Sequence, residues 1–209
     1  MNEILPSALK QIINFLEKLE KENFINYYLV GGILVNIYSV FRITQDIDFV
    51  VDLISNEMNI ESYILQLQKF EFSPLQDWKT TISLAKQSKI IQFFDKQDVV
   101  KFDNYIIDKI DRNKYKRIGP IALKRRLREK LFNIECWVVS KEDFIISKLV
   151  YGGWQDYTDA LGCWMRFSET LDVPYMEKVG KNLEIKRELD LLMSGIDDPD
   201  DYFKQIKGY

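Results

Sequence analysis

The sequence predicts an α+β fold, in which a sheet-rich first part is flanked by helices and followed by an all-helical C-terminal part. Before residue 140, short apolar or alternating runs typical of strands are interspersed with segments of helical periodicity. After residue 140, apolar residues recur at helical spacing only. We therefore expect two domains, residues 1–139 and residues 140–209.

Elements of both kinds are expected in the first part. Helices are predicted at 6–21, 33–40 and 57–68, from apolar residues that recur every three or four positions. Strands are predicted over the β-rich runs at 27–30, 47–53, 80–84, 90–94, 99–107 and 134–139. The segment 123–131 contains Leu123, Leu127 and Leu131, whose spacing of four favours a helix.

The second part begins with a capping box, the run Ser-Lys-Glu-Asp at 140–143. A helix is expected from Ser140 to about Tyr151, where Gly152 and Gly153 end it. Further helices are predicted at 155–167, after Pro174, at 182–193 and after Pro199.

Composition excludes several kinds of chemistry. The 209 residues carry a net charge of −3 and include no histidine, so a Ser-His-Asp triad, a Cys-His nucleophile and a histidine-bound zinc are all excluded. Cys136 and Cys163 lack partners at metal-ligand spacing, and we interpret them as reduced packing residues. Residues 1–7 do not resemble a secretion signal, and the apolar region 27–38 is too interrupted to span a bilayer. We expect a cytoplasmic protein without membrane contact.

Charge is unevenly distributed. Residues 109–130 contain ten basic and two acidic residues, a local charge of +8, whereas the end of the chain is acidic. Such a segment indicates either a face for an anionic partner such as RNA or an ordinary solvated surface.

The most informative stretch contains a glycine pair and a pair of acids. Gly31 and Gly32 follow an apolar strand and precede a helix, where free backbone N–H groups favour a phosphate. Asp46 and Asp48 are two residues apart on the next strand, so both project from one face. Two neighbouring carboxylates repel each other unless a cation lies between them, and Mg²⁺ typically binds one or two carboxylates together with substrate phosphates. The stretch therefore predicts a phosphate site beside a metal site.

These residues resemble the signature of the nucleotidyltransferase superfamily, typified by DNA polymerase beta. The string from Val30-Gly31-Gly32 to Arg42-x-Thr44-x-Asp46-Ile47-Asp48 is similar, more narrowly, to minimal nucleotidyltransferases and to the toxin-type family AbiEii. The resemblance covers about residues 27–164. It implies a mixed β-sheet with flanking helices and a C-terminal helical subdomain, and it suggests an outer hairpin at 123–139, turning near Phe132 and Asn133, as the alternative to a helix.

In that superfamily, a third acid on a neighbouring strand completes the metal site. Alternation in 101–105 turns Asp103 away from Phe102 and Asn104, and the resemblance places the third ligand in this lysine-hydrophobe-aspartate context. Asp95 and Asp98 compete for the role, but both lie in a turn-like run, where acids commonly serve as turn residues.

The resemblance also covers part of the helical region. In the toxin-type family, a lysine on the helix after the last strand and an aspartate on the next helix belong to the active site, and the matching positions are Lys148 and Asp159. Each is otherwise an ordinary helix-surface residue. Arg42 and Thr44 are weaker candidates: Arg42 either contacts a phosphate or is an exposed loop arginine.

The predicted function is a Mg²⁺-dependent nucleotidyltransferase with one or two ions, which transfers NMP from an NTP to an acceptor and releases pyrophosphate. For the acceptor, the resemblance implies tRNA in the toxin-type family, or a small molecule in the aminoglycoside-type transferases. The alternative from another class is a non-catalytic module that binds nucleotide or an antitoxin-type protein partner.

Overall fold

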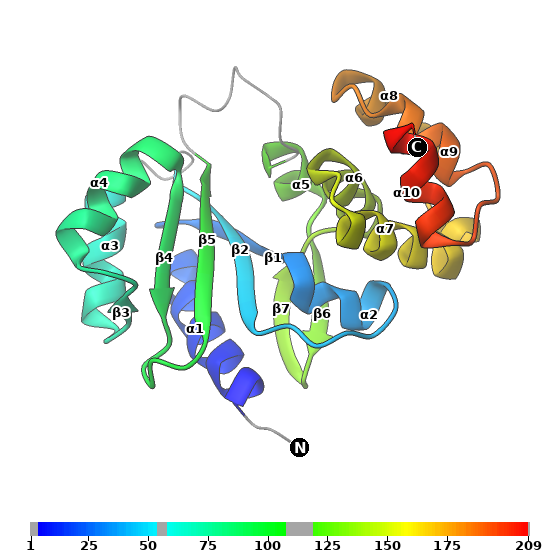
Figure 1. Ribbon diagram of the computed structural model, residues 1–209. Helices are drawn as coiled ribbons and strands as arrows, with labels where there is room; N and C mark the ends of the chain where they lie inside the picture. The colour runs from blue at the N-terminus through cyan, green and yellow to red at the C-terminus, as the bar shows by residue number, and fades with distance from the viewer. Residues whose placement is uncertain (1–3, 54–57, 108–118, 209) are drawn as a thin grey trace.

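The computed structural model describes residues 4–53, 58–107 and 119–208, shown in Figure 1. The strands are β1 (Asn26–Val30), β2 (Asp46–Asp52), β3 (Ser73–Pro74), β4 (Ile90–Phe94), β5 (Lys101–Ile107), β6 (Leu127–Leu131) and β7 (Ile134–Val138). They form a seven-stranded sheet of order β3-β4-β5-β2-β1-β7-β6. The pairs β2–β5 and β1–β7 are parallel and the other pairs are antiparallel. The mixed sheet and the α+β class are confirmed.

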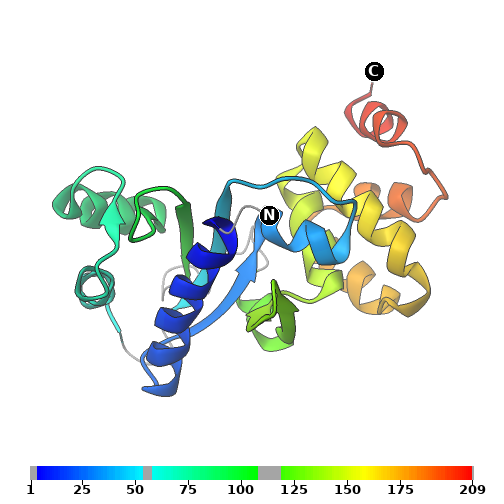
Figure 2. The same ribbon diagram turned by 90° about the horizontal axis from the view of Figure 1, so that it is seen from below.

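Helices cover the sheet and make up the C-terminal part. They are α1 (Ile4–Lys21), α2 (Val35–Tyr38), α3 (Ile60–Lys69), α4 (Trp78–Ser88), α5 (Gly119–Arg125), α6 (Lys141–Tyr151), α7 (Trp154–Phe167), α8 (Val173–Asn182), α9 (Lys186–Leu192) and α10 (Pro199–Lys207). Two views show α3 and α4 beside the β3–β4 edge, whereas α6 to α10 gather at the other end of the molecule (Figures 1 and 2). The division into domains at residue 140 stays a prediction.

One face of the central strands packs into an aromatic core. Phe72, Phe93 and Phe102 are buried and in contact, with ring centroids 5.1 to 5.7 Å apart. The ring of Phe15, from α1, packs edge-on against Phe72. Because strand side chains alternate, burying these rings on one face turns the intervening residues of β2 and β5 to the opposite face. That opposite face carries the polar residues described below.

The run Thr80–Leu84 is helical, and the prediction of a strand there was wrong. It lies within α4, whose N-terminus is capped by Asp77: the Asp77 side chain accepts a hydrogen bond of 2.9 Å from the backbone N–H of Thr80. The buried residues Thr81 and Ala85 are four positions apart, so the helix presents one face to the core. Capping and helical spacing therefore outweigh the strand preference of the two threonines.

Other boundaries differ by smaller amounts. The predicted helix at 33–40 is a 3₁₀ turn, η1 (Gly31–Leu34), followed by the single turn of α2. The helix predicted at 57–68 spans 60–69, with Asn59 as its N-cap, and residue 57 lies outside the described residues. The helix predicted at 182–193 begins only at Lys186, because Asn182 ends α8 and Glu184 adopts a positive φ between α8 and α9.

The segment 123–131 combines the two alternatives. Helix α5 ends at Arg125, and β6 and β7 then form a hairpin in which Leu131 pairs with Ile134. The two loop residues, Phe132 and Asn133, both have positive φ, as a type I′ turn requires.

The helical part starts at the predicted residue, but the Asp143 carboxylate accepts a hydrogen bond from the Tyr175 hydroxyl instead of completing the predicted capping box. The Ser140 hydroxyl caps α6 by accepting from the N–H of Asp143, and Gly152, with a φ of 70°, ends the helix. Cys136 and Cys163 are buried and free. Within the described ranges, no helix combines the length and apolar character needed to cross a bilayer.

Candidate active site

The three predicted acids lie together on one face of the sheet, and we call Asp46, Asp48 and Asp103 the acidic row. Strands β2 and β5 run parallel in a register that pairs Asp48 with Asp103 and Asp46 with Lys101. Their flanking residues Ile47 and Phe102 are fully buried on the opposite face. The parallel register therefore brings acids 55 positions apart in the sequence onto neighbouring positions of one surface.

Asp103 has protein partners on both of its carboxylate oxygens. Gln92, opposite it on β4, donates to Oδ1 at 2.9 Å, and the ammonium of Lys101 donates to Oδ2 at 2.9 Å. The same ammonium lies 4.0 Å from Oδ2 of Asp46. Lys101 therefore lies between two members of the acidic row, and its hydrogen bond to Asp103 raises its pKa, so it remains charged at neutral pH.

Asp48 is the least neutralised of the three acids. Burial, and then the negative charges of Asp46 and Asp103, raise the pKa of Asp48 from 3.8 to about 7. A backbone hydrogen bond from Gly32 and the positive charge of Lys148 lower this pKa, but they do not offset the other effects. At neutral pH, a cation placed next to Asp48 would gain attraction that the protein alone does not supply.

The glycine turn packs directly against Asp48. Gly31 has a φ of 73°, and a Cβ added there would lie 2.0 Å from Oδ2 of Asp48. A Cβ on Gly32 would lie 2.9 Å from the Thr44 hydroxyl oxygen and 3.2 Å from a terminal nitrogen of Arg42. Larger residues would therefore displace Asp48, Thr44 or Arg42, so the glycines are required for this close approach.

The loop before β2 is tied to the same place. The Thr44 hydroxyl donates to Oδ1 of Asp46 at 2.9 Å, which orients that carboxylate. The predicted helix dipole at the glycine turn is small here, because η1 and α2 are each four residues long. Any phosphate affinity of this turn must come from nearby N–H groups and side-chain cations.

The predicted residues Arg42, Lys148 and Asp159 form a second group together with Asp156, and we call these four residues the paired cluster. Asp159, with 2% of its side chain exposed, accepts two hydrogen bonds from the Arg42 guanidinium, at 3.1 and 3.2 Å. It also lies 2.7 Å from the ammonium of Lys148, which contacts Asp156 at 2.9 Å. Asp159 and Lys148 are therefore buried, and Arg42 is held in place, in contrast to the surface interpretations of these residues.

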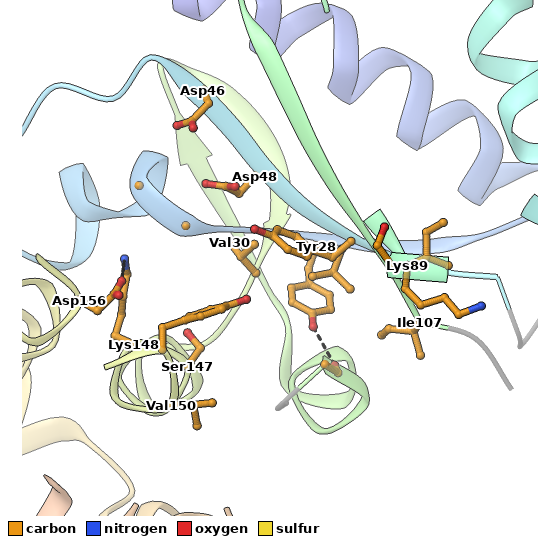
Figure 3. Close-up of a pocket in the computed structure, with 18 of the residues that line it drawn as sticks. Tyr28, Val30, Asp46, Asp48, Lys89, Ile107, Ser147, Lys148, Val150 and Asp156 are labelled. Atoms are coloured by element: carbon orange, nitrogen blue, oxygen red, sulfur yellow. Dashed lines mark hydrogen bonds and ion pairs between the residues drawn. The ribbon is translucent and has the colours of Figure 1, made fainter. Parts of the chain in front are cut away.

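A cavity of about 680 Å³ joins the two groups. Figure 3 shows Asp46 and Asp48 at one side of it, Lys89 and Ile107 at the other, and Lys148 with Asp156 on the helical wall. Gly31, Gly32, Arg42 and Thr44 also line it, and Asp159 lies behind the lining residues Lys148 and Arg42 that it contacts. Asp103 and its partner Lys101 are not part of the lining; Asp103 adjoins it through its strand neighbour Asp48. The far side includes the lining residues Ile107, Tyr28, Val50 and Tyr105, the last three being neighbours across β1, β2 and β5. Tyr151 lines the cavity from α6, the helix of Lys148.

The donor set fits a hard divalent cation by charge and by chemistry. Once Asp48 loses its proton, three carboxylates and the one ammonium of Lys101 give a net charge of −2, and carboxylate oxygens are the ligands that Mg²⁺ prefers. In the described ranges, no three acidic, cysteine or histidine side chains already have the arrangement of a metal cluster. Lys101 and the carboxylates would therefore have to adjust around an ion. Asp46 and Asp48 are the accessible ligands, because both line the cavity.

The competing acids have structural partners. The Asp95 carboxylate accepts from the backbone N–H groups of Val99 and Val100, at 2.7 and 3.0 Å, and Asp98 adopts a positive φ. Both are turn residues, as their sequence context indicates.

Sequence reasoning missed three polar residues of the site: Lys101, Gln92 and Asp156. Lys101 could have been found, because it lies two positions before Asp103 and so shares its face of the strand. Gln92 depends on the pairing of β4 with β5, which no local pattern specifies.

The basic segment 109–130 is only partly described, since residues 109–118 lie outside the described ranges. Three of its arginines are engaged within the protein. Arg126 pairs with Glu20 at 2.6 Å, Arg128 pairs with Glu17, and both guanidiniums stack on the ring of Trp137. Arg125 stacks on Tyr175 and faces Asp143. These arginines hold α1, α8 and the hairpin in place, so they offer little free charge to a nucleic acid.

Comparison with known proteins gives a likeness of fold. No protein-family model and no curated protein sequence matches the chain. Among solved structures, it is similar to an antigenic nucleotidyltransferase-like protein from Paracoccidioides brasiliensis, with a TM-score of 0.53 and 14% sequence identity. The alignment covers 89% of this chain and 92% of that chain. The chain therefore has a nucleotidyltransferase-like fold.

Proposed function

Starting from this fold, we propose that the protein is a Mg²⁺-dependent nucleotidyltransferase that transfers NMP from an NTP to an acceptor. The observation that carries the proposal is the acidic row beside the glycine turn, inside a cavity of suitable size. The 680 Å³ of this cavity lies within the range of small-molecule and cofactor sites. A fold shared with nucleotidyltransferases does not imply their activity, so the proposal depends on the site residues.

Each residue of the site has a role in the proposed reaction. Asp46 and Asp48 would hold Mg²⁺, and Asp103 completes the acidic row behind them. When bound, the ion would neutralise phosphate charge. The glycine turn leaves room for the phosphates, and Arg42 and Lys148, whose charges Asp156 and Asp159 balance, place N–H groups at the wall of the cavity.

The chemical step is a substitution at the α-phosphorus. The acceptor oxygen forms a bond to this phosphorus, the bond to the bridging oxygen of the β-phosphate breaks, and pyrophosphate leaves with that electron pair. The acceptor proton is released to solvent. Positioning and charge neutralisation provide most of the catalysis in such reactions, which suits a chain without histidine.

The apolar side of the cavity supports a place for the nucleoside. Tyr28 and Tyr105 line it together with Val50 and Ile107. A planar base gains stacking energy on aromatic rings, and such stacking tolerates different bases. The proposal therefore places the triphosphate near Asp48 and the base towards the tyrosines.

For the acceptor, we keep tRNA or another RNA, as in the toxin-type family, and a small molecule of the aminoglycoside type. The internal pairing of Arg125, Arg126 and Arg128 reduces the support for RNA from the basic segment. Because NTP and Mg²⁺ are abundant in the cytoplasm, that is the compartment the proposal requires.

A second candidate function is a non-catalytic module that binds nucleotide or an antitoxin-type protein. It is favoured by one observation, the ammonium of Lys101 between Asp46 and Asp103, because an internal cation there could replace the metal.

The proposal is tested by incubating the protein with each α-labelled NTP, Mg²⁺ and total RNA, then resolving the products on a gel and measuring pyrophosphate. Label in RNA identifies an RNA acceptor, and label in the protein identifies a protein acceptor. Pyrophosphate without label in either one directs the search to aminoglycoside-type acceptors. If no NTP releases pyrophosphate and none raises the melting temperature, the enzyme proposal is wrong.

A further inference from the structure

The ammonium of Lys101 has a fixed place in the acidic row. Lys101 and Asp103 are two residues apart on β5 and project from the same face, and their side chains join at 2.9 Å. Register with β2 sets Lys101 opposite Asp46, to which its ammonium lies at 4.0 Å. The amide of Gln92 bonds the other oxygen of Asp103, so this carboxylate is held from both sides.

This arrangement divides the acidic row into two unequal parts. Asp46 and Asp48 line the cavity, whereas neither Asp103, with 13% of its side chain exposed, nor its partner Lys101 does. A cation that approached Asp103 would meet the Lys101 ammonium on one carboxylate oxygen and the Gln92 amide on the other, so it would be repelled by the first and compete with both. A cation that approached Asp48 would meet no such competitor among the described side chains.

The charges lead to the same division. With all three carboxyl groups ionised, three carboxylates and one ammonium leave a net charge of −2 before substrate binds, which a single divalent ion neutralises. A second divalent ion next to Asp103 would place two positive charges beside the Lys101 ammonium. Like charges this close repel each other strongly, because a partly buried site screens them less than bulk water does.

We propose that Lys101 occupies the place of a second metal ion, so that the acidic row binds one divalent cation, between Asp46 and Asp48, when nucleotide is present. The inference rests on the proposed function, because it concerns the same site. Lys101 is then a positioning residue: it holds Asp103 and supplies one of the positive charges that the site needs. The observation that favoured a non-catalytic module becomes part of a one-metal site.

Counting bound Mn²⁺ tests this directly. The wild-type protein and its variants are saturated with a non-hydrolysable NTP analogue, and bound Mn²⁺ per complex is measured by electron paramagnetic resonance. We expect one ion for wild type and for Lys101→Arg, which keeps the charge, and two for Lys101→Met. Lys96→Met is the matched control. Lys96 forms an ion pair of 3.2 Å with Glu71, and this pair lies outside the site. It should bind one ion.

The melting temperature of the metal-free protein, measured without nucleotide, is a second test beside the Mn²⁺ count. Removing the only ammonium of the row leaves three carboxylates unpaired, so metal-free Lys101→Met should melt several degrees below wild type at low ionic strength. Added Mn²⁺ should restore the melting temperature, whereas Lys96→Met should show neither effect.

The outcomes separate this inference from the proposed function. Two ions in the wild-type complex, a measurement that needs no variant, would overturn the role of Lys101 and leave the enzyme proposal standing. One ion in both wild type and Lys101→Met would also overturn it, because Lys101 would not be the group that excludes the second ion. If the analogue and Mn²⁺ bind to neither protein, the proposed function fails and this inference fails with it.

Discussion

The acidic row and the paired cluster border the same cavity but differ in charge balance. In the paired cluster, Asp156 and Asp159 neutralise Arg42 and Lys148 through contacts of 2.7 to 3.2 Å. In the acidic row, three carboxylates share the single ammonium of Lys101, and the pKa of Asp48 is raised to about 7. A cluster whose charges balance holds its own side chains in place. A cluster with excess negative charge can also bind a cation from outside the protein.

The largest expected effect comes from removing one charge of the acidic row. Asp46→Asn or Asp48→Asn should fold but lower the rate of NMP transfer by about 10³-fold or more. Each variant removes one carboxylate ligand of the ion, which would otherwise neutralise the negative charge that develops on the phosphates during transfer. Initial rates of pyrophosphate release measure this. Asp98→Asn is the control, since this turn aspartate has a positive φ that asparagine tolerates. Undiminished turnover in both site variants would refute their assignment.

A smaller effect, on stability, is expected when the paired cluster is broken. Asp159→Asn removes the buried charge shared by Arg42 and Lys148, so the free energy of unfolding should fall by about 3 kcal/mol. Urea denaturation measures it. The matched control is Asp190→Asn, whose exposed pair with Lys186 lies one helical turn apart and should change stability by less than about 0.5 kcal/mol. Equal losses in the two variants would show that the paired cluster has no special role.

The smallest effect is a pH dependence that belongs to the acidic row alone. The unfolded chain loses the Asp48 proton near the ordinary pKa of 3.8, whereas the folded protein keeps it to about 7. The folded state therefore binds more protons between these values, and the metal-free protein loses stability as pH rises through this window. Asp48→Asn avoids this loss and should be more stable than wild type by about 1–2 kcal/mol at pH 8, a figure below the full pKa shift because solvent screens the site.

This last prediction is measured as the difference in urea midpoint between wild type and Asp48→Asn, from pH 4 to pH 8 without metal. The difference should be near zero at pH 4 and grow towards pH 8. With saturating Mg²⁺ and nucleotide its sign should reverse, because ligand binding to the folded state then favours wild type. A difference independent of pH would mean that Asp48 is not held at a raised pKa.

Local patterns in the sequence predicted the parts of the site that lie close together in the chain. Gly31, Gly32, Asp46 and Asp48 follow from turn chemistry and from the two-residue period of a strand. Asp103 required the resemblance as well, since the alternation in β5 gives its face but not its neighbour. The strand prediction at 80–84 failed because Asp77 caps a helix there, which the β-preference of two threonines does not reveal.

Contacts between distant segments could not be predicted. Arg42 and Asp159 are 117 positions apart in the sequence, and they form an ion pair only because α7 packs against the loop before β2. The same holds for the arginines of the basic segment: Arg126 meets Glu20 across 106 positions. A run of positive charge in a sequence does not tell whether its partners are other molecules or acids elsewhere in the same chain.

The measurement that tests the central claim most directly is calorimetric titration of a non-hydrolysable NTP analogue into the protein, with and without Mg²⁺. We predict 1:1 binding that needs the metal in wild type and weakens at least tenfold in Asp48→Asn, while Asp98→Asn matches wild type. Binding of equal strength in wild type and Asp48→Asn, or no binding to wild type at all, would contradict the claim that the unbalanced acidic row holds a divalent ion for a triphosphate.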